Sequence, residues 1–220
     1  MDDVGLGQGY ESTSGFREAF NKAFGTPRDA RDTDVIKVTW LESPVGPLLA
    51  AATSRAVVLL EFTERRMLEA QFDTLRRRFQ TPIVPGDNPH LAKLRQELVE
   101  YFDGRRKAFT VPLNYPGTPF QQKVWDELLK IPYGETRSYE DIARAVGSTS
   151  AVRAVGQTNG LNRICVVIPC HRVVNKDGKL GGYGGGLWRK QALLTLEQGQ
   201  KQIDMRAPEP TAQWAWLKHG

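Results

Sequence analysis

Residues 35–62 read VIKVTWLESPVGPLLAAATSRAVVLLEF and contain three short apolar runs separated by turn-forming residues. The runs cover residues 35–41, 47–53 and 56–62, and they are rich in Val, Leu and aromatic side chains, which are enriched in β-strands. Pro and Gly in the segment 43–47, and a short polar step after the second run, suit the tight connections of hairpins. The pattern therefore predicts three antiparallel strands that follow one another as a meander.

The residues after this meander show the spacing of amphipathic helices. Apolar side chains recur three or four positions apart over 64–80 and again over 88–103, which predicts two helices. Residues 111–120 read VPLNYPGTPF, and three prolines with one glycine indicate a linker rather than a regular element. We therefore expect a strand-and-helix subdomain over residues 34–115 and place the boundary to a second subdomain near Pro116.

Helical segments dominate beyond the linker. Residues 119–132 read PFQQKVWDELLKIP and predict a helix. We expect the following side chains to share its apolar face: Phe120, Val124, Trp125, Leu128 and Leu129. Ser138 and Asp141 are spaced as in a capping box that starts a helix, and Ser148 or Ser150 can cap a second short helix that reads SAVRAVGQTN. Two short helices joined by a tight turn are typical of a helix-turn-helix.

Composition limits the class of protein. With 220 residues, 40% hydrophobic and 25% charged content, the chain can bury one core or two small ones and has no bias towards disorder. Its net charge of +5 permits binding to nucleic acid, although a basic surface alone is weak support for that partner. The apolar runs are far shorter than the ~20 residues of a membrane-spanning helix. The acidic, glycine-containing start is unlike a signal peptide, so we expect a cytoplasmic protein.

The two cysteines have different settings. Neither they nor the three histidines show the paired spacing of a zinc site, so we predict free thiols and no metal. Cys165 lies within the apolar run ICVVI and is expected to be a small core residue, the commonest role of a cysteine in such a run. Cys170 follows Pro169, where we expect a buried strand to end and to present the thiol. If a turn or short helix begins there, free amides and positive charge from His171 and Arg172 would lower the pKa of Cys170 towards the nucleophilic thiolate.

The motif IPCHRVV at 168–174 resembles the signature of the O6-alkylguanine-DNA alkyltransferases. The resemblance covers about residues 34–198, because PFQQKVW, YGETRSY, RAVG, GGYGGGL and LLTLEQ follow in the same order as in that family. It implies an α/β plus α fold: a ribonuclease H-like α/β subdomain with an antiparallel sheet, then a helical, winged helix-turn-helix-like subdomain over residues 116–198.

The resemblance also implies an activity. The second subdomain would bind double-stranded DNA through the minor groove and extrude the damaged nucleotide, because the alkylated oxygen is otherwise inside the base stack. The implied reaction is irreversible, single-turnover transfer of a methyl or other alkyl group from O6-alkylguanine to Cys170, with O4-alkylthymine as a further candidate substrate. The protein would act as a monomer and without a cofactor.

The resemblance assigns roles to individual residues as well. It implies that Glu197 holds the ring of His171, which takes the proton of Cys170 through a water molecule. The residues implied at the substrate pocket are Tyr139, Asn162, Val173, Tyr183 and Gly184. The residues implied at the DNA are Ser138, Ala151, Arg153 and Gly156. Arg153 would take the place of the flipped base in the stack.

Several of these residues have a plainer interpretation from the sequence alone. Tyr139 can be an ordinary helix residue rather than a donor to the guanine ring, and Asn162 can be a turn residue rather than a tie to the active-site turn. Glu197 can be a solvated helix end, and Arg153 an exposed helix cation. Gly184 stands where some members of the family have serine, so the range of substrates stays open.

A second resemblance lies near the start of the chain. Residues 9–27 read GYESTSGFREAFNKAFGTP and are similar to the end of an AraC-type helix-turn-helix, as found in Ada-like regulators. We expect residues 1–33 to be a leader, either that remnant or an amphipathic helix that packs on the body, and residues 199–220 to be a tail. A damage reader without chemistry, a transcription regulator and, more distantly, a thiol protease remain alternative functions. Cys170 argues against the reader.

Overall fold

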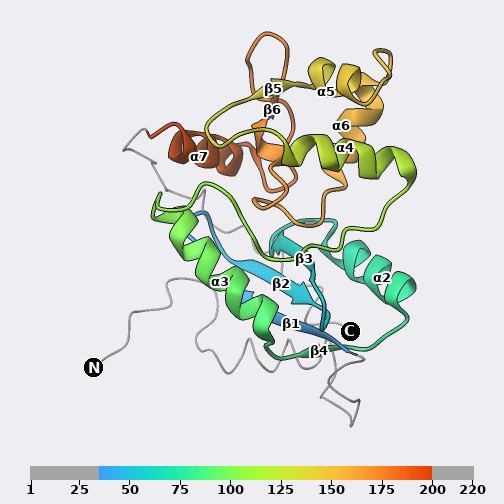
Figure 1. The fold of residues 1–220 in the computed structure, drawn as a ribbon, viewed down its shortest axis with the longest axis vertical. Helices are drawn as coiled ribbons and strands as arrows, with labels where there is room; N and C mark the ends of the chain where they lie inside the picture. Colours follow the sequence, from blue (N-terminus) through green and yellow to red (C-terminus); the bar gives the residue numbers. More distant parts are fainter. Residues whose placement is uncertain (1–34, 200–220) are drawn as a thin grey trace.

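The computed structural model describes residues 35–199, and Figure 1 shows two parts, a sheet with two helices below and a group of helices above. The predicted order of a sheet-containing subdomain followed by a helical one is confirmed. The predicted leader over 1–33 and the predicted tail beyond residue 199 lie outside the described residues. None of the described helices is long and apolar enough to cross a membrane.

The predicted meander is confirmed. Strands β1 (Ile36–Leu41), β2 (Leu48–Ala52) and β3 (Val57–Phe62) pair antiparallel in chain order. A fourth strand that the sequence analysis missed, β4 (Ile83–Pro85), pairs parallel with β1, so the strand order is β3-β2-β1-β4. With three residues β4 is too short to show a period, and its proline is tolerated because it lies on an edge strand.

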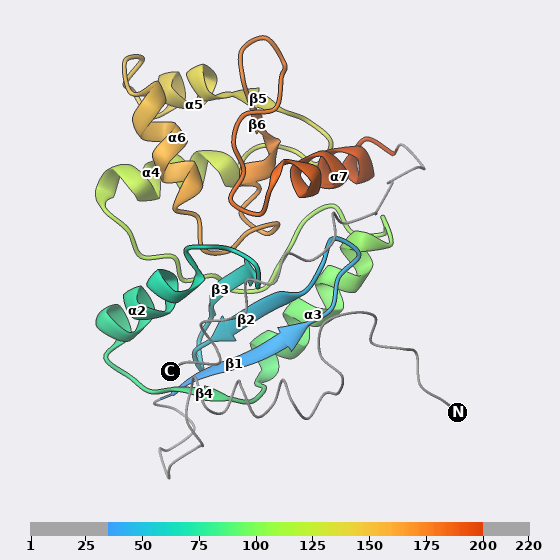
Figure 2. The ribbon, with the colours of Figure 1, turned by 180° about the vertical axis from the view of Figure 1, so that it is seen from behind.

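Helices cover both faces of the sheet. The two predicted helices are α2 (Leu68–Phe79) and α3 (Pro89–Phe102), and in Figure 2 the sheet lies in front of α3. Leu48 of β2 packs in one hydrophobic cluster with α3, whereas its neighbour Leu49 packs in another with Phe72 of α2. Successive side chains of a strand point to opposite faces of the sheet. Since helices cover both faces, every residue of β2 and β3 is buried, and buried and exposed side chains do not alternate.

Irregular segments cover the outer edge of β3. Val57 exchanges two backbone hydrogen bonds of 2.9 and 2.8 Å with the linker, and Leu60 exchanges two of 2.8 Å with the segment that contains Cys165. The run ICVVI at 164–168 is therefore not the buried strand that we expected. It makes a single bridge at its first residue and then turns, with Val166 in the left-handed region at φ 68°. An apolar run by itself does not distinguish a buried turn from a buried strand.

Helix α4 (Pro119–Leu129) opens the second subdomain. It begins at Thr118, which forms a capping box with Gln121, and proline occupies the first turn where its missing amide proton costs nothing. Leu128 of the predicted apolar face is buried, but Leu129 is 40% exposed, so the prediction for Leu129 is wrong. Adjacent helix residues point about 100° apart, which turns Leu129 out of the face that Leu128 occupies.

The predicted pair of short helices follows as α5 (Tyr139–Ala145) and α6 (Val152–Gly160). The capping box at the start of α5 is confirmed. The hydroxyl of Ser138 accepts a hydrogen bond from the Asp141 amide at 3.1 Å, and the Asp141 carboxylate accepts one from the Ser138 amide at 3.0 Å. Both helices pack against α4, which gives the compact three-helix group at the top of Figure 1.

The start of α6 differs from the prediction. Neither Ser148 nor Ser150 caps it through a side chain, because the N-cap residue is Ala151, which makes no side-chain hydrogen bond. The Ala151 amide instead donates to the backbone carbonyl of Ser148 at 3.0 Å. A tight backbone turn therefore joins the two helices where a serine cap was expected.

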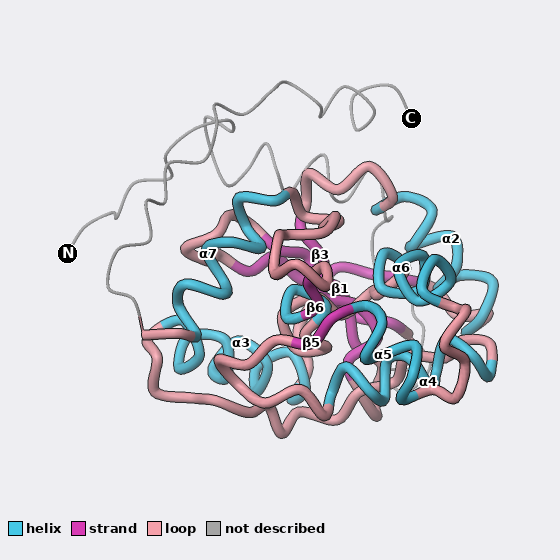
Figure 3. Tube along the Cα trace, turned by 90° about the horizontal axis from the view of Figure 1, so that it is seen from above, coloured by secondary structure: helices cyan, strands magenta, loops and turns pink. Residues whose placement is uncertain are grey.

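A short parallel pair connects the helices to the Cys170 segment. The turn η2 (Cys170–Arg172) leads directly into β6 (Val173–Val174), which pairs with β5 (Arg137–Ser138). Helix α7 (Leu187–Glu197) closes the subdomain, and Figure 3 shows β5 and β6 between α7 and the group of α4, α5 and α6. The pairing places the start of α5 beside the residues that follow Cys170.

Candidate active site

Cys170 opens the short helical turn η2, which is the condition that the sequence analysis set for a lowered pKa, but it is not presented to solvent. Its exposed fraction is 4%, and His171 and Arg172 are buried as well, so the prediction of an exposed thiol is wrong. The side-chain amide of Asn162 donates to Cys170 Sγ at 3.1 Å and to the carbonyl oxygen of Ile168 at 2.8 Å. Asn162 therefore joins the sulfur to the turn that precedes it.

The charge environment of the thiol also differs from the expectation. Burial raises the pKa of Cys170, whereas we expected His171 and Arg172 to lower it. A hydrogen bond from Asn162 and two buried cations oppose the effect of burial. These cations are Arg65 and Lys190. The two sequence neighbours instead turn towards Glu197, which explains why a prediction based on adjacency failed.

His171 and Glu197 form the predicted pair. His171 Nε2 lies 2.9 Å from Glu197 Oε1, and both side chains are fully buried. Burial lowers the pKa of His171, which favours the neutral ring. Desolvation alone would raise the pKa of Glu197, but hydrogen bonds from His171 and Arg172, together with the positive charge of Arg172, hold it well below its usual value. A neutral His171 ring beside this carboxylate carries its proton on Nε2. Nδ1 is buried and has no partner among the described residues, so it can accept a proton.

Glu197 has more partners than the resemblance implied. Arg172 donates to both carboxylate oxygens, from Nε and Nη2 at 2.8 Å each, and the Tyr101 hydroxyl donates at 2.6 Å. The backbone amide of Gly134 adds a hydrogen bond of 3.1 Å. Glu197 is thus a buried centre of hydrogen bonds and not a solvated helix end. Tyr101 was not predicted from the sequence, because its contact with Glu197 spans 96 residues and leaves no local signal.

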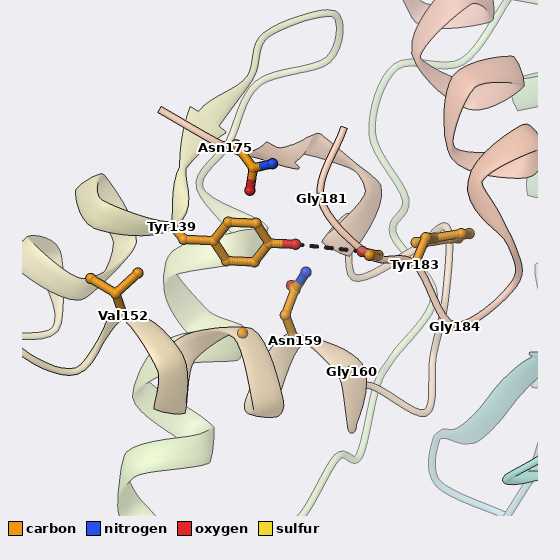
Figure 4. Close-up of a pocket in the computed structure, with 10 residues that line it drawn as sticks. Tyr139, Val152, Asn159, Gly160, Asn175, Gly181, Tyr183 and Gly184 are labelled. Carbon is orange, nitrogen blue, oxygen red and sulfur yellow. Dashed lines mark hydrogen bonds between the residues drawn. The ribbon is translucent and has the colours of Figure 1, made fainter. Parts of the chain in front are cut away.

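A pocket of about 470 Å³ lies beside the active-site turn, within the range of small-molecule sites. Figure 4 shows Tyr139 projecting into it, with the hydroxyl donating to the Gly182 carbonyl at 3.4 Å. Asn159, from the α6 wall, donates to the Cys170 carbonyl at 3.2 Å and so connects the pocket to the cysteine. The hydroxyl of Tyr183 is buried and has no partner in the described part of the chain. The lining also includes Val152, Gly156, Asn175, Gly181 and Gly184.

The predicted DNA-binding residues gather near this pocket. Gly156 lines it, and Arg153 is exposed in the first turn of α6. Ala151 precedes that turn, and Ser138 caps α5. Val173, predicted at the substrate, is instead fully buried on β6 and does not belong to the lining. The structure therefore brings the α5 and α6 residues together, while their contact with DNA stays a prediction.

A buried lysine that sequence analysis did not single out completes the site. Lys190 Nζ donates to the carbonyl oxygens of Val173 at 2.6 Å and Gly181 at 3.2 Å. Burial lowers the pKa of Lys190 to about 8, and the nearby Cys170 opposes this shift. Lys190 lies two helical turns before Glu197 on α7, so both share the apolar face of that helix. This spacing was the sequence signal that could have indicated a buried lysine. Within residues 35–199 no cluster of His, Cys, Asp or Glu is arranged to hold a metal ion.

Two family models match this chain. The model described as "6-O-methylguanine DNA methyltransferase, ribonuclease-like domain" matches residues 36–115. The model described as "6-O-methylguanine DNA methyltransferase, DNA binding domain" matches residues 119–199. Together with the sheet and helices above, these matches confirm the predicted fold class of a ribonuclease-like subdomain followed by a helical DNA-binding one.

Relatives and solved structures agree with these matches. The methylated-DNA–protein-cysteine methyltransferase of Mycobacterium tuberculosis is 44% identical over 165 residues, which are 75% of this chain and 94% of the relative. The constitutive enzyme of Bacillus subtilis is 44% identical over 161 residues, with 73% of this chain and 94% of the relative covered. The crystal structure of M. tuberculosis O6-methylguanine methyltransferase has a TM-score of 0.65 at 40% identity, covering 77% of this chain and 97% of that one.

A second solved structure contains nucleic acid. M. tuberculosis OGT in complex with DNA has a TM-score of 0.63 at 41% identity and covers 75% of this chain and 93% of that one. The sequence and structural likeness thus extends through both subdomains and includes a protein seen on DNA. On these grounds the chain belongs to the 6-O-methylguanine DNA methyltransferase family.

Proposed function

We propose that this chain repairs alkylated guanine in double-stranded DNA by moving the alkyl group from O6 to Sγ of Cys170, once per molecule. The observation that carries the proposal is the hydrogen bond of 3.1 Å from Asn162 to that sulfur beside a buried His171–Glu197 pair. The adjoining pocket of about 470 Å³ has room for a base. The names of the curated relatives, methylated-DNA–protein-cysteine methyltransferases, support the same chemistry.

The chemical step needs a base and a nucleophile. The thiol proton passes to Nδ1 of His171, directly or through a water molecule, and the Glu197 carboxylate stabilises the resulting imidazolium. The thiolate of Cys170 then attacks the alkyl carbon, so that a sulfur–carbon bond forms while the carbon–O6 bond breaks. The bonding pair stays on the guanine, which takes up one proton. The step balances without an oxidant or a reductant, and the thioether product leaves no route back to the thiol.

Recognition of the base falls to the pocket and to the two short helices. The hydroxyl of Tyr139 projects into the pocket and can donate to the ring nitrogen that gains charge as the alkyl group leaves. We place α6 in the minor groove, where the small residues Ala151 and Gly156 allow the helix to approach closely. Arg153 fills the gap left by the extruded nucleotide. We expect the protein to act as a monomer and in the cytoplasm.

The test is the mass of the intact protein after incubation with a duplex that contains O6-methylguanine. We expect a gain of one methyl group, located on Cys170 by peptide mapping, and no gain for Cys170→Ala. Cys165→Ala is the matched control, because Cys165 is buried among apolar residues and should leave the reaction as in the parent. A methyl group on another residue, or several turnovers per molecule, would overturn the proposal. Tight binding without any mass gain would indicate a damage reader instead.

A further inference from the structure

Arg65 joins the two subdomains behind the pocket. It lies between β3 and α2, and its side chain is only 7% exposed. Nη1 donates to Glu61 Oε2 at 2.6 Å, and Nη2 donates to the carbonyl oxygen of Gly160, the last residue of α6. Glu61 is fully buried on β3 and also accepts a hydrogen bond of 3.0 Å from Gln71. One guanidinium therefore connects the sheet of the first subdomain to the end of α6 in the second.

The same guanidinium occupies the space beside Gly184. A Cβ atom added to Gly184 would overlap Nη1, Cζ and Nη2 of Arg65, so a side chain there requires the arginine to move. Gly160 and Gly184 both line the pocket, and Figure 4 shows them at the same end of it. Arg65 itself is not part of the lining. It supports the place where the α6 wall and the loop wall of the pocket meet.

The charge of Arg65 suits this position in two ways. The last carbonyl groups of a helix have no partner within the helix, and a cation is favourable at that end. Burial raises the pKa of Cys170, and the positive charge of Arg65 acts in the opposite direction. Glu61 also acts on the thiol and raises its pKa. The other charged, titratable or hydrogen-bonding groups that act on the thiol, or on which it acts, are Tyr139, Asn162, Cys165, Tyr183 and Lys190.

We propose that Arg65 is a positioning residue for alkyl transfer: it holds the Gly160 end of α6 and the loop at Gly184 in place beside Cys170. The positive charge of Arg65, which opposes the effect of burial on the Cys170 thiol, supports this role. This inference rests on the proposed function. Arg65 acts through neighbouring residues rather than by contact with the substrate. It further implies that residues 65 and 184 are coupled, since a side chain at 184 competes with the guanidinium for one space.

The first test removes the guanidinium without leaving a buried charge alone. In the full chain, Glu61→Gln with Arg65→Met eliminates both charges at similar volume. Replacing both members of a buried ion pair in this way is often neutral for the stability of the fold. We expect an unchanged melting temperature but a loss of roughly 10- to 100-fold in the single-turnover rate with O6-benzylguanine near neutral pH. The pH midpoint of the rate should also move upward, because the charge of Arg65, which lowers the pKa of Cys170, outweighs the charge of Glu61, which raises it. Arg65→Lys should restore the midpoint more than the rate, and Arg66→Met, at the exposed neighbouring arginine, should change neither.

The second test measures the coupling. Gly184→Ser should slow the parent by a larger factor than it slows the Glu61→Gln/Arg65→Met variant, in which the space is free. Equal factors in the two backgrounds, or a double variant that is as fast as the parent at every pH, would overturn the inference.

Failure of the proposed function has a different signature, namely a parent that gains no mass from alkylated guanine. In that event the pH dependence of Cys170 modification by iodoacetamide, mapped by peptide mass, compares the same variants without any alkylated base. An upward midpoint in Glu61→Gln/Arg65→Met would support the role of Arg65, and an unchanged midpoint would refute it.

Discussion

Replacing Asn162 with alanine tests the hydrogen bond to the reactive sulfur. Asn162 Nδ2 lies 3.1 Å from Cys170 Sγ and, as a donor, stabilises the thiolate more than the thiol. A hydrogen bond to a charged group contributes about 1.5–3 kcal/mol. With about 1.4 kcal/mol per tenfold change, Asn162→Ala should reduce the thiolate population at a given pH roughly 10- to 100-fold. The variant further raises the pKa of Cys170, so the lost rate should return as the pH increases.

The assay is single-turnover alkylation by O6-benzylguanine, followed by intact mass over a range of pH. The Asn162 side chain also donates to the Ile168 carbonyl at 2.8 Å and accepts from the Ile164 amide at 3.0 Å, so some loss of stability is expected as well. A loss caused only by a loosened turn would lower the rate by the same factor at every pH. That outcome, with an unmoved midpoint, would refute the role assigned to the bond. Asn175→Ala, on the pocket lining but without a bond to the sulfur, is the matched comparison for the midpoint.

Three further predictions concern stability and DNA binding. Glu197→Gln removes the buried counterion of Arg172 and should destabilise the fold by about 3–5 kcal/mol in urea unfolding. Because the folded-state pKa of Glu197 is depressed, its contribution to stability is present above the usual value of 4.5 and is lost as the pH falls below it, so the variant should show a flatter acid dependence. Trp125→Ala should cost about 3–5 kcal/mol in the same assay, since this ring is fully buried and its Nε1 donates to the Thr158 carbonyl at 3.0 Å. Arg153→Ala should weaken binding to alkylated duplex by about 1–3 kcal/mol and slow the reaction with duplex more than that with the free base, which a binding titration and the mass assay can check.

The elements that sequence analysis predicted correctly are those whose signals are local. The strands over 35–62 have their own alternation of apolar runs and turns, and the capping box of Ser138 and Asp141 lies within four residues. The same reasoning failed for β4 and for the run ICVVI. The conformation of each depends on pairing with a distant segment: β4 pairs with β1, and Ile164 of the run forms a single bridge to Leu60. The residues of the run alone do not determine such a pairing.

The charge on the thiol was predicted wrongly for a related reason. Adjacency to His171 and Arg172 suggested two cations beside Cys170, yet both side chains point to Glu197, which lies 26 and 25 residues away from them. The cations that do act on the sulfur come from distant positions in the chain. Sequence spacing can identify which residue types are available, but the pairing of buried charges is settled by tertiary contacts.

Glu197 shows why the chemistry depends on both subdomains. Its carboxylate is buried, and such a charge is tolerated only when donors surround it. Two of the donors, His171 and Arg172, belong to the active-site turn, whereas Tyr101 reaches the carboxylate from α3 of the first subdomain. Without the Tyr101 hydroxyl, one oxygen would lose its shortest hydrogen bond, and the position of the His171 ring would be less well defined. The sheet subdomain therefore supports His171, the proposed base, although the cysteine, the pocket and the helix-turn-helix all lie in the second subdomain.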